Sequence, residues 1–197
     1  VAASTHPGED EIVRDAHRRL AAQVPSLLSV IVPRHPERGA AIAQMLSGDG
    51  LRVALRSRDQ LPAGDTDIYV SDTMGELGLF YRLAPVVFMG GSLVPHGGQN
   101  PIEAIKLGAA IVHGPHVFNF TDTYAALDRA GGAVRAGSSD DLVAVLARLM
   151  NDPAARQQVA GAGDDVVSRL GGALERTLKA LEPYLLQMQL EAGGPDA

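Results

Sequence analysis

The segment GGSLVPHGGQNPIE, residues 90–103, holds residue types suited to binding an anion through the backbone. Gly97 and Gly98 lack a Cβ atom, so the chain can approach a ligand closely and adopt a positive φ. The pattern predicts a helix directly after them, with Asn100 as its cap, and unpaired N–H groups at a helix start bind phosphate without any lysine. Glu103, in the first turn, could accept hydrogen bonds from a vicinal diol such as a ribose. The alternative is an ordinary first-turn acid that the helix dipole favours.

Two other loops offer side chains for an anion. The loop PRHPER ends an apolar run at 27–33 and contains Arg34. A guanidinium can grip a carboxylate or a phosphate with two parallel hydrogen bonds; a surface ion pair with Glu37 is the alternative. The loop STHPGE precedes a helical pattern, so it could equally serve as a helix cap. The further side chains that could meet an anion in these two loops are Ser4, Thr5, His6 and His35.

The loop SDTMGE, residues 71–76, leads into another expected helix. Its backbone could bind a nucleotide base. The residues that would do so are Met74, Gly75 and Glu76. The alternative is that Thr73 or Asp72 caps the helix, since both types are common at this position. The sequence leaves both functions open for this loop.

Several familiar catalytic and metal-binding patterns are missing. Neither G-x-G-x-x-G nor G-x-x-x-x-G-K-[ST] occurs, which argues against a dinucleotide fingerprint and a P-loop NTPase. His113 and His116 are separated by Gly-Pro and so lie on a turn, with no carboxylate spaced to complete a metal site. No close carboxylate pair on one element and no Ser-His-Asp order stands out. The residues thus predict a binding site for an anionic, nucleotide-like ligand, without a metal, a cofactor or an evident catalytic base.

The elements that must position these loops alternate regularly along the chain. Short apolar runs rich in β-branched residues are typical of strands buried on both faces, and segments with helical spacing lie between them. The expected strands are 1–4, 27–33, 51–55, 67–71, 85–89, 109–112 and 133–135. The expected helices are 8–23, 37–48, 75–83, 102–107, 120–130, 139–150, 153–169 and 173–190. This alternation predicts an α/β fold: a Rossmann-like parallel sheet with helices on both faces.

Each of the polar loops directly follows an expected strand, and so does a fifth segment, HGPHVFNF at 113–120. In a parallel sheet the carboxyl ends of the strands share one edge, and ligands bind there at the point where strand order reverses. Five loops rich in Gly, His, Ser, Thr, Asn and Arg should therefore meet at one edge. This convergence is a more specific signal than any single loop.

The composition is that of an ordinary globular protein, with 46% hydrophobic and 20% charged residues among 197. The net charge of −6 argues against non-specific binding to nucleic acid. Cysteine is absent, which excludes disulfides, thiolate metal sites and cysteine catalysis. No apolar run approaches the roughly 20 residues that span a bilayer. The chain begins without Met, in what resembles the end of a strand, so we expect a piece of a longer protein.

The segments STHPGE, PRHPER, DTMGELGLFYRLAPVVFMGGSLVPHGGQNPIEA and GPHVFNF, in this order and spacing, resemble the C-terminal half of bacterial 3-deoxy-D-manno-octulosonic acid (Kdo) transferases. The resemblance is most specific at 72–120. It implies the C-terminal domain of a GT-B glycosyltransferase, in which two Rossmann-like domains enclose the active site. It also divides the chain into a nucleotide-sugar-binding domain, 1–150, and C-terminal helices, 151–197, which pack on that domain or reach toward the other one.

The resemblance implies a role for most of the loop residues. Arg34 lies in a segment that contacts the nucleotide, the backbone at 74–76 would meet the cytidine, and Glu103 would bind the ribose. The residues facing the phosphate would be Gly97, Gly98 and Asn100. The residues beside the donor sugar would be Gly90, Gly91 and Ser92. The cation that holds the Kdo carboxylate would be Arg34, His6 or His35.

Two features depart from the family pattern. Gln99 stands where a histidine is expected, and glutamine cannot carry a charge. The N-terminal domain, which in the family carries the glutamate proposed as general base and binds the lipid A precursor, is absent from this chain. We therefore expect this chain alone to bind the donor nucleotide at most weakly and to transfer no sugar.

The resemblance also implies partners and a location. The partners are CMP-Kdo or CMP, and a lipid A precursor through the missing domain; the implied reaction belongs to lipopolysaccharide biosynthesis and inverts the anomeric centre. Membrane association, at the cytoplasmic face of the bacterial inner membrane, would come from the missing N-terminal part. The alternatives are another GT-B transferase or an epimerase that uses a UDP-sugar, and a stand-alone nucleotide-binding module.

Overall fold

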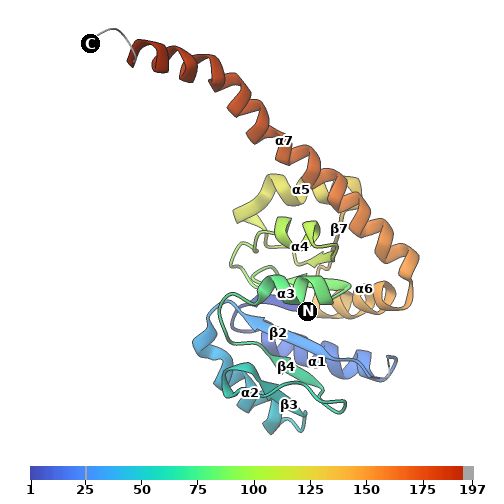
Figure 1. Ribbon diagram of the computed structural model, residues 1–197. Helices are drawn as coiled ribbons and strands as arrows, with labels where there is room; N and C mark the ends of the chain where they lie inside the picture. The colour runs from blue at the N-terminus through green and yellow to red at the C-terminus, as the bar shows by residue number, and fades with distance from the viewer. Residues whose placement is uncertain (25, 193–197) are drawn as a thin grey trace.

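The structure is a computed structural model that describes residues 1–24 and 26–192. Its centre is one sheet of seven parallel strands in the order β3-β4-β2-β1-β5-β6-β7 (Figure 1). The strands are β1 (Ala2–Thr5), β2 (Ser29–Pro33), β3 (Val53–Leu55), β4 (Ile68–Val70), β5 (Val86–Met89), β6 (Ala110–His113) and β7 (Ala133–Arg135). Each predicted strand overlaps one of these, so the parallel α/β sheet is confirmed.

Helices connect the strands. The α-helices are α1 (Glu9–Ala21), α2 (Gly39–Gly48), α3 (Leu77–Leu83), α4 (Ile102–Lys106), α5 (Thr121–Ala130), α6 (Ser139–Asn151) and α7 (Pro153–Ala192). The short 3-10 helices are η1 (Pro36–Arg38), η2 (Arg56–Arg58) and η3 (Phe118–Phe120). At the start of α6 the hydroxyl of Ser138 accepts the N–H of Asp141 at 3.1 Å and so caps the helix.

Side chains of the strands alternate between the two faces of the sheet, with one apolar core on the first face and two on the second. Along β5, Val86 and Phe88 belong to the core on the first face, whereas Val87 and Met89 belong to a core on the second, and all four are buried. Helices α1, α2 and α6 cover the first face, and α3, α4 and α5 cover the second. Burial on both faces explains why the strands are continuous apolar runs in the sequence.

Helix α7 crosses from the core on the first face of the sheet to a core on the second. Val159 packs in the core beneath α1 and α6, whereas Val166 and Val167 pack in the core beneath α4 and α5. Beyond these residues α7 extends past the rest of the molecule, as the orange-to-red ribbon of Figure 1 shows. Among the described residues, no helix combines the length and the apolar character needed to cross a lipid bilayer.

The prediction of two separate helices at 153–169 and 173–190 is wrong, because α7 is one continuous helix. Gly171 and Gly172, at the predicted break, remain helical. A glycine inside a helix costs about 1 kcal/mol relative to alanine, and neighbouring Ala, Leu, Glu and Lys residues favour the helix enough to offset such a cost. The predicted C-terminal segment also includes 193–197, which lie outside the described residues.

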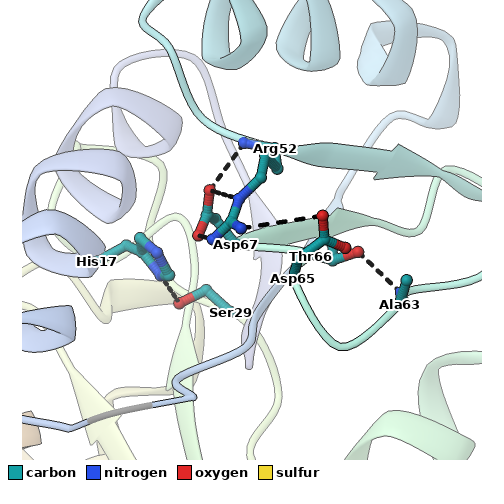
Figure 2. A network of polar contacts seen from close by, with 7 residues as sticks. All are labelled: His17, Ser29, Arg52, Ala63, Asp65, Thr66 and Asp67. Atoms are coloured by element: carbon teal, nitrogen blue, oxygen red, sulfur yellow. Dashed lines mark hydrogen bonds and ion pairs between the residues drawn. The ribbon is translucent and has the colours of Figure 1, made fainter.

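Polar contacts near the amino ends of the strands hold the edge of the sheet in register (Figure 2). Asp67 accepts the backbone N–H of Arg52 at 2.8 Å and two guanidinium N–H groups of the same residue at 2.7 and 3.1 Å. These bonds lower the pKa of Asp67 to about 2. Nearby, Nδ1 of His17 in α1 lies 2.9 Å from the hydroxyl of Ser29 in β2, and burial lowers the pKa of His17. These contacts lie away from the predicted binding loops.

Strands β1 and β5 lie side by side at the centre of the sheet. From β1 the chain proceeds to β2 on one side, and from β5 it proceeds to β6 on the other. The strand order therefore reverses between β1 and β5, where sheets of this class bind their ligands. The five polar loops follow β1, β2, β4, β5 and β6, so their predicted convergence at one edge is confirmed.

Candidate functional site

The loops after β1 and β5 touch each other at the point where strand order reverses. Ser4, near the end of β1, has a positive φ of 57°. A Cβ atom on Gly90 would lie 2.4 Å from the carbonyl oxygen of Ser4, so only glycine permits this approach. Both residues were predicted to contact the donor sugar or an anion. The structure shows that their backbones pack the two loops together.

Thr5 supports the loop after β2 from inside. Its side chain is fully buried, and its hydroxyl donates to Oδ1 of Asp10 at 2.7 Å. Its carbonyl oxygen accepts the N–H of Arg34 and Nη1 of Arg38, each at 3.0 Å. Arg38 also forms an ion pair with Asp10, whose pKa is raised by burial and lowered in part by the bonds from Thr5 and Arg38. Thr5 thus positions Arg34 through its carbonyl group. Because its one hydroxyl donor is bonded to Asp10, Thr5 has, contrary to the prediction, no side-chain donor for an anion.

Three imidazoles gather where these loops meet. The ring of His6 stacks on the ring of His96, with centroids 4.1 Å apart and planes 19° apart, and it meets His35 edge-on at 6.1 Å. Nε2 of His6 also lies 3.3 Å from Nε2 of Gln99. Burial lowers the pKa of His6, and the two neighbouring histidines and two arginines add to this effect. A bound anion would favour the protonated form of His6, because opposite charges stabilise the charged form.

His96 was not predicted to belong to the site, because in the sequence it stands far from the other two histidines. Arg34 and His35 are exposed, as an anion-binding role requires. Glu37, the alternative partner of Arg34, lies 3.8 Å from Nδ1 of His35 instead. Arg34 forms no ion pair with any of the residues that the structure describes. Its guanidinium is therefore open to a ligand.

The glycine-serine segment after β5 has its backbone committed to a buried carboxylate. The amides of Gly91, Ser92 and Leu93 all donate to Glu9. Ser92 is fully buried, and its hydroxyl accepts the N–H of Gly114 at 2.7 Å. Gly91 and Ser92 were predicted to lie beside the donor sugar. Their N–H groups are occupied, and their carbonyl groups already accept the N–H groups of Gly98 and His116, so the sugar contact of these two residues stays a prediction.

The double glycine has the backbone conformation that the sequence predicts. Gly97 and Gly98 have positive φ angles of 91° and 73°. A Cβ atom on Gly97 would lie 2.5 Å from Nδ2 of Asn119, which itself donates to the carbonyl of His96 at 2.9 Å. The N–H of Gly98 donates to the carbonyl of Gly91 at 2.8 Å. Both positions thus require glycine, and Gly98 ties its loop to the glycine-serine segment.

The side chain of Asn100 supports the start of α4, because its Oδ1 accepts the N–H of Ile102 at 3.0 Å, but the N-cap position is Pro101, one residue later than predicted. Helix α4 has five residues, so its dipole sums only a few peptide groups. Among the described residues, no group accepts a hydrogen bond from the N–H of Gly97, Gln99 or Asn100. These three amides are the groups that could bind a phosphate here.

Glu103 is exposed, and its carboxylate has no hydrogen bond or ion pair with another described residue. It lies against α3: a Cβ atom on Gly78 would come within 3.3 Å of its Oε1. Burial raises the pKa of Tyr81, and the nearby charge of Glu103 adds to that rise. The carboxylate is therefore unpaired and accessible, as a ligand for a ribose diol must be.

The loop after β4 is organised by a pair of side chains. Glu76 accepts three hydrogen bonds of 2.8–3.1 Å from the guanidinium of Arg56 and one from the hydroxyl of Thr73. These bonds lower the pKa of Glu76 to about 2. Met74 is 80% exposed and Gly75 has a φ of 86°. The backbone of this loop is thus presented at the surface. No local pattern in the sequence indicates that Arg56 supports it.

The alternative in which Thr73 or Asp72 caps α3 is wrong. The hydroxyl of Thr73 bonds to Glu76, and the carboxylate of Asp72 accepts the N–H and hydroxyl of Ser57 at 2.8 and 2.7 Å. Helix α3 begins later, at Leu77, with no side-chain cap. Asp72 and Glu76 therefore bind the segment after β3, whereas Thr73 binds within its own loop.

His113 belongs to the core. It is fully buried, with Nδ1 2.8 Å from the carbonyl of Gly114 and Nε2 2.9 Å from Oδ1 of Asp128. His116 is half-buried on the following turn. Within residues 1–24 and 26–192, no group of three or more histidine and acidic side chains converges in a way that could hold a metal ion.

Comparisons with known proteins agree with these features, although no protein-family model matches the chain. The chain is 40% identical over 186 residues to a 3-deoxy-D-manno-octulosonic acid transferase of Haemophilus influenzae and 37% identical over 187 residues to one of Bordetella pertussis. These alignments cover 94% and 93% of this chain but 44% of each relative. The chain therefore spans less than half the length of the curated relatives it matches.

Solved structures show which domain of these transferases the chain resembles. The C-terminal CMP-Kdo binding domain of WaaA from Acinetobacter baumannii has a TM-score of 0.81 and 31% identity, over 84% of this chain and 86% of that one. The C-terminal domain of a group 1 glycosyl transferase from Francisella tularensis shares the fold, with a TM-score of 0.57 and 15% identity. The predicted GT-B type of fold is confirmed. The chain belongs to the Kdo transferase family and corresponds to its C-terminal domain.

Proposed function

We propose that this chain binds the sugar nucleotide CMP-Kdo and is the donor half of an inverting Kdo transferase. The observation that carries this proposal is the arrangement at the point of strand reversal. There, the unpaired carboxylate of Glu103, three unpaired amides and the cluster of Arg34 with imidazoles lie along one edge of the sheet. The relative from Acinetobacter, a CMP-Kdo binding domain, supports this choice of ligand.

Each part of the donor has a matching group. The amides of Gly97, Gln99 and Asn100 would bind the phosphate, and the carboxylate of Glu103 would accept the ribose hydroxyls. The backbone of residues 74–76 would meet the cytosine. The Kdo carboxylate would lie against the imidazole cluster, where Arg34 offers a planar fork and the side chains of His6 and His35 offer ring N–H groups. The side chain of Gln99, 3.3 Å from His6, would hold that imidazole in place.

The reaction follows from this geometry. When the bond between Kdo and the phosphate breaks, negative charge develops on the departing CMP, and preorganised backbone N–H groups stabilise it. The other domain of the longer enzyme would carry the general base and bind the lipid A precursor. Closure of the two domains would exclude water from the reacting centre. This chain alone would then bind the donor but transfer no sugar.

The longer enzyme would act on a membrane-bound acceptor. The relatives are more than twice as long as this chain, and the part they have in addition would bind the lipid A precursor and attach to the cytoplasmic face of the bacterial inner membrane. These functions would require no membrane contact from the domain described above.

Calorimetric titration of the chain with CMP, UMP and UDP tests the proposed ligand. We expect CMP to bind more tightly than UMP, because the loop after β4 would contact the base edge that distinguishes cytosine from uracil. Tighter binding of UDP than of CMP would instead support a transferase or epimerase that uses a UDP-sugar.

The variant Glu103→Gln tests the ribose contact. We expect about tenfold weaker binding of CMP, the effect of losing hydrogen bonds to a charged group. Binding of 2′-deoxy-CMP is the matched control, because that ligand lacks one hydroxyl of the diol and its affinity should change less. Equal affinity of the variant and the wild type for CMP would remove Glu103 from the site.

A further inference from the structure

Glu9 carries a carboxylate that is fully buried and surrounded by backbone N–H groups. Its Oε2 accepts the amides of His6 at 3.0 Å and Gly91 at 2.6 Å. Its Oε1 accepts the amides of Ser92 at 3.1 Å and Leu93 at 3.0 Å. Four donors thus converge on one side chain, which is the number of lone-pair sites that a carboxylate offers.

These four amides come from both sides of the point where strand order reverses. His6 lies in the loop after β1, whereas Gly91, Ser92 and Leu93 lie in the loop after β5. Glu9 is the first residue of α1, and its own N–H donates back to the carbonyl of His6 at 3.0 Å. The side chain therefore fastens the two loops to each other and to the start of the helix.

The contact is specific for a carboxylate. All four partners donate, so an amide side chain at this position would turn its NH2 group toward other N–H groups. No described cation forms an ion pair with Glu9, so the four amides are the described partners of its carboxylate. Glu11, the exposed acid in the first turn of α1, has no comparable surroundings.

The segment that Glu9 holds bears directly on the imidazole cluster. A Cβ atom on Gly91 would lie 3.1 Å from Cδ2 of His6 and 3.5 Å from Nε2 of Gln99. Gly91 also accepts the N–H of Gly98, so the double-glycine loop rests on the same segment. A shift of Gly91 would therefore displace His6, Gln99 and Gly98 together.

We propose that Glu9 is a positioning residue of the donor site, which holds the segment 91–93 and the backbone of His6 in the geometry that receives the sugar. The nature of the ligand in this inference rests on the proposed function. Glu9 itself touches no ligand, since its side chain is fully buried and both oxygens are occupied. It acts through the segment that faces the sugar.

Hydrogen exchange tests the role of Glu9 without any ligand. In Glu9→Gln we expect the amides of Gly91, Ser92 and Leu93 to exchange at least about tenfold faster by NMR, because local opening then costs less. Glu11→Gln, a change of the same kind in the same helical turn, should leave them unchanged. Wild-type exchange rates in Glu9→Gln would overturn the proposal.

Measurements of ligand affinity distinguish a positioning role of Glu9 from a general loss of stability. We expect Glu9→Gln to weaken CMP-Kdo by about tenfold and CMP by less, because CMP lacks the sugar that the segment 91–93 would face and would keep its contacts with Glu103 and with residues 74–76. Equal weakening of both ligands together with a lower Tm would indicate only a structural role and overturn the proposal. Tighter binding of either ligand would also overturn it, since Glu9 would then be competing with the ligand for these amides.

A variant that retains the charge covers the case in which Glu9→Gln does not fold. Glu9→Asp keeps the carboxylate but withdraws it by one methylene, so we expect faster exchange at the same three amides and a smaller loss of CMP-Kdo affinity. A wild-type chain that binds neither CMP nor CMP-Kdo would count against the proposed function, and the exchange rates would then decide the role of Glu9 by themselves. Unchanged exchange and affinity in Glu9→Asp would overturn the positioning role.

Discussion

At the scale of single residues, three glutamates near the binding edge have three different surroundings. Glu9 is buried among backbone amides, Glu76 is paired with Arg56, and Glu103 is exposed with no described partner. A carboxylate that is already paired holds a loop in shape, whereas an unpaired one can bind hydroxyls. The prediction of a ligand contact at Glu76 therefore concerns its backbone, and the prediction at Glu103 concerns its side chain.

The pair of Glu76 and Arg56 gives a test by pH. The pKa of Glu76 is about 2 in the folded protein, against an ordinary value of 4.5. The pair thus contributes to the free energy of unfolding above about pH 4.5, and this contribution is lost as the pH falls from 4.5 toward 2. In Arg56→Gln we expect the pKa of Glu76 to rise toward 4.5 in an NMR titration of its carboxyl carbon.

Arg58→Gln is the matched control for this titration, because Arg58 lies two residues away and is exposed. It should leave the pKa of Glu76 at about 2. The loop after β4 should also loosen in Arg56→Gln, with weaker binding of CMP than in Arg58→Gln. A pKa of about 2 that persists in Arg56→Gln would mean that Thr73 is the dominant partner.

At the scale of elements, the loops at the binding edge depend on backbone conformations that only glycine adopts easily. The loop after β5 uses positive φ at Gly91, Gly97 and Gly98, and each lies against another loop. These contacts place three unpaired amides directly before α4. The loop is therefore better described as a rigid cradle than as a flexible connection.

Gly97→Ala tests this rigidity. The added methyl group would lie 2.5 Å from the side chain of Asn119, and the φ of 91° is one that a residue with a Cβ atom rarely adopts. We therefore expect a loss of about 1–3 kcal/mol in the free energy of unfolding. Urea denaturation measures the change. CMP binding should weaken in the same variant, because Gly97 supplies one of the three amides.

Gly161→Ala is the control for that substitution. Gly161 is exposed within α7, with open space around the position of a Cβ atom. Alanine should therefore stabilise the chain by up to about 1 kcal/mol through its higher helix propensity. A Gly97→Ala variant as stable as Gly161→Ala would show that the loop adapts to a side chain.

At the scale of the whole molecule, the two halves of α7 differ in how far their side chains are buried. Its first half contributes Val159, Val166 and Val167 to two cores, whereas Leu181 and Tyr184 are 46% and 67% exposed. Figure 1 shows the second half leading away from the sheet. The stability of the domain should therefore depend on the first half alone.

Two truncations test this division. A chain that ends at Arg169 keeps the buried valines, so its Tm in a calorimetric scan should lie within about 2 °C of the full chain, and its affinity for CMP should be unchanged. A chain that ends at Asn151 exposes both of these cores and should not fold cooperatively. Unfolding of the longer fragment would show that the second half of α7 also packs on the domain.

Several features of this protein follow from the sequence alone. The alternation of apolar runs and helical segments determines the parallel α/β sheet, since strands buried on both faces must be apolar throughout. The position of each polar loop directly after a strand determines that these loops share one edge. Gly97, Gly98 and Asn100 could be assigned from local chemistry, because positive φ and helix capping involve only neighbouring residues.

Only the tertiary structure decided which charged and polar groups are paired. Glu9 meets Gly91 across 82 positions, and His6 meets Gln99 across 93, distances in the chain that no local pattern spans. The segment GGS therefore has occupied amides, Arg56 supports the loop after β4, and His96 joins the imidazole cluster. The low helix propensity of Gly171 is likewise outweighed by neighbouring residues that favour the helix. Residue type determines what a group can bind, but packing determines whether that group is already bound.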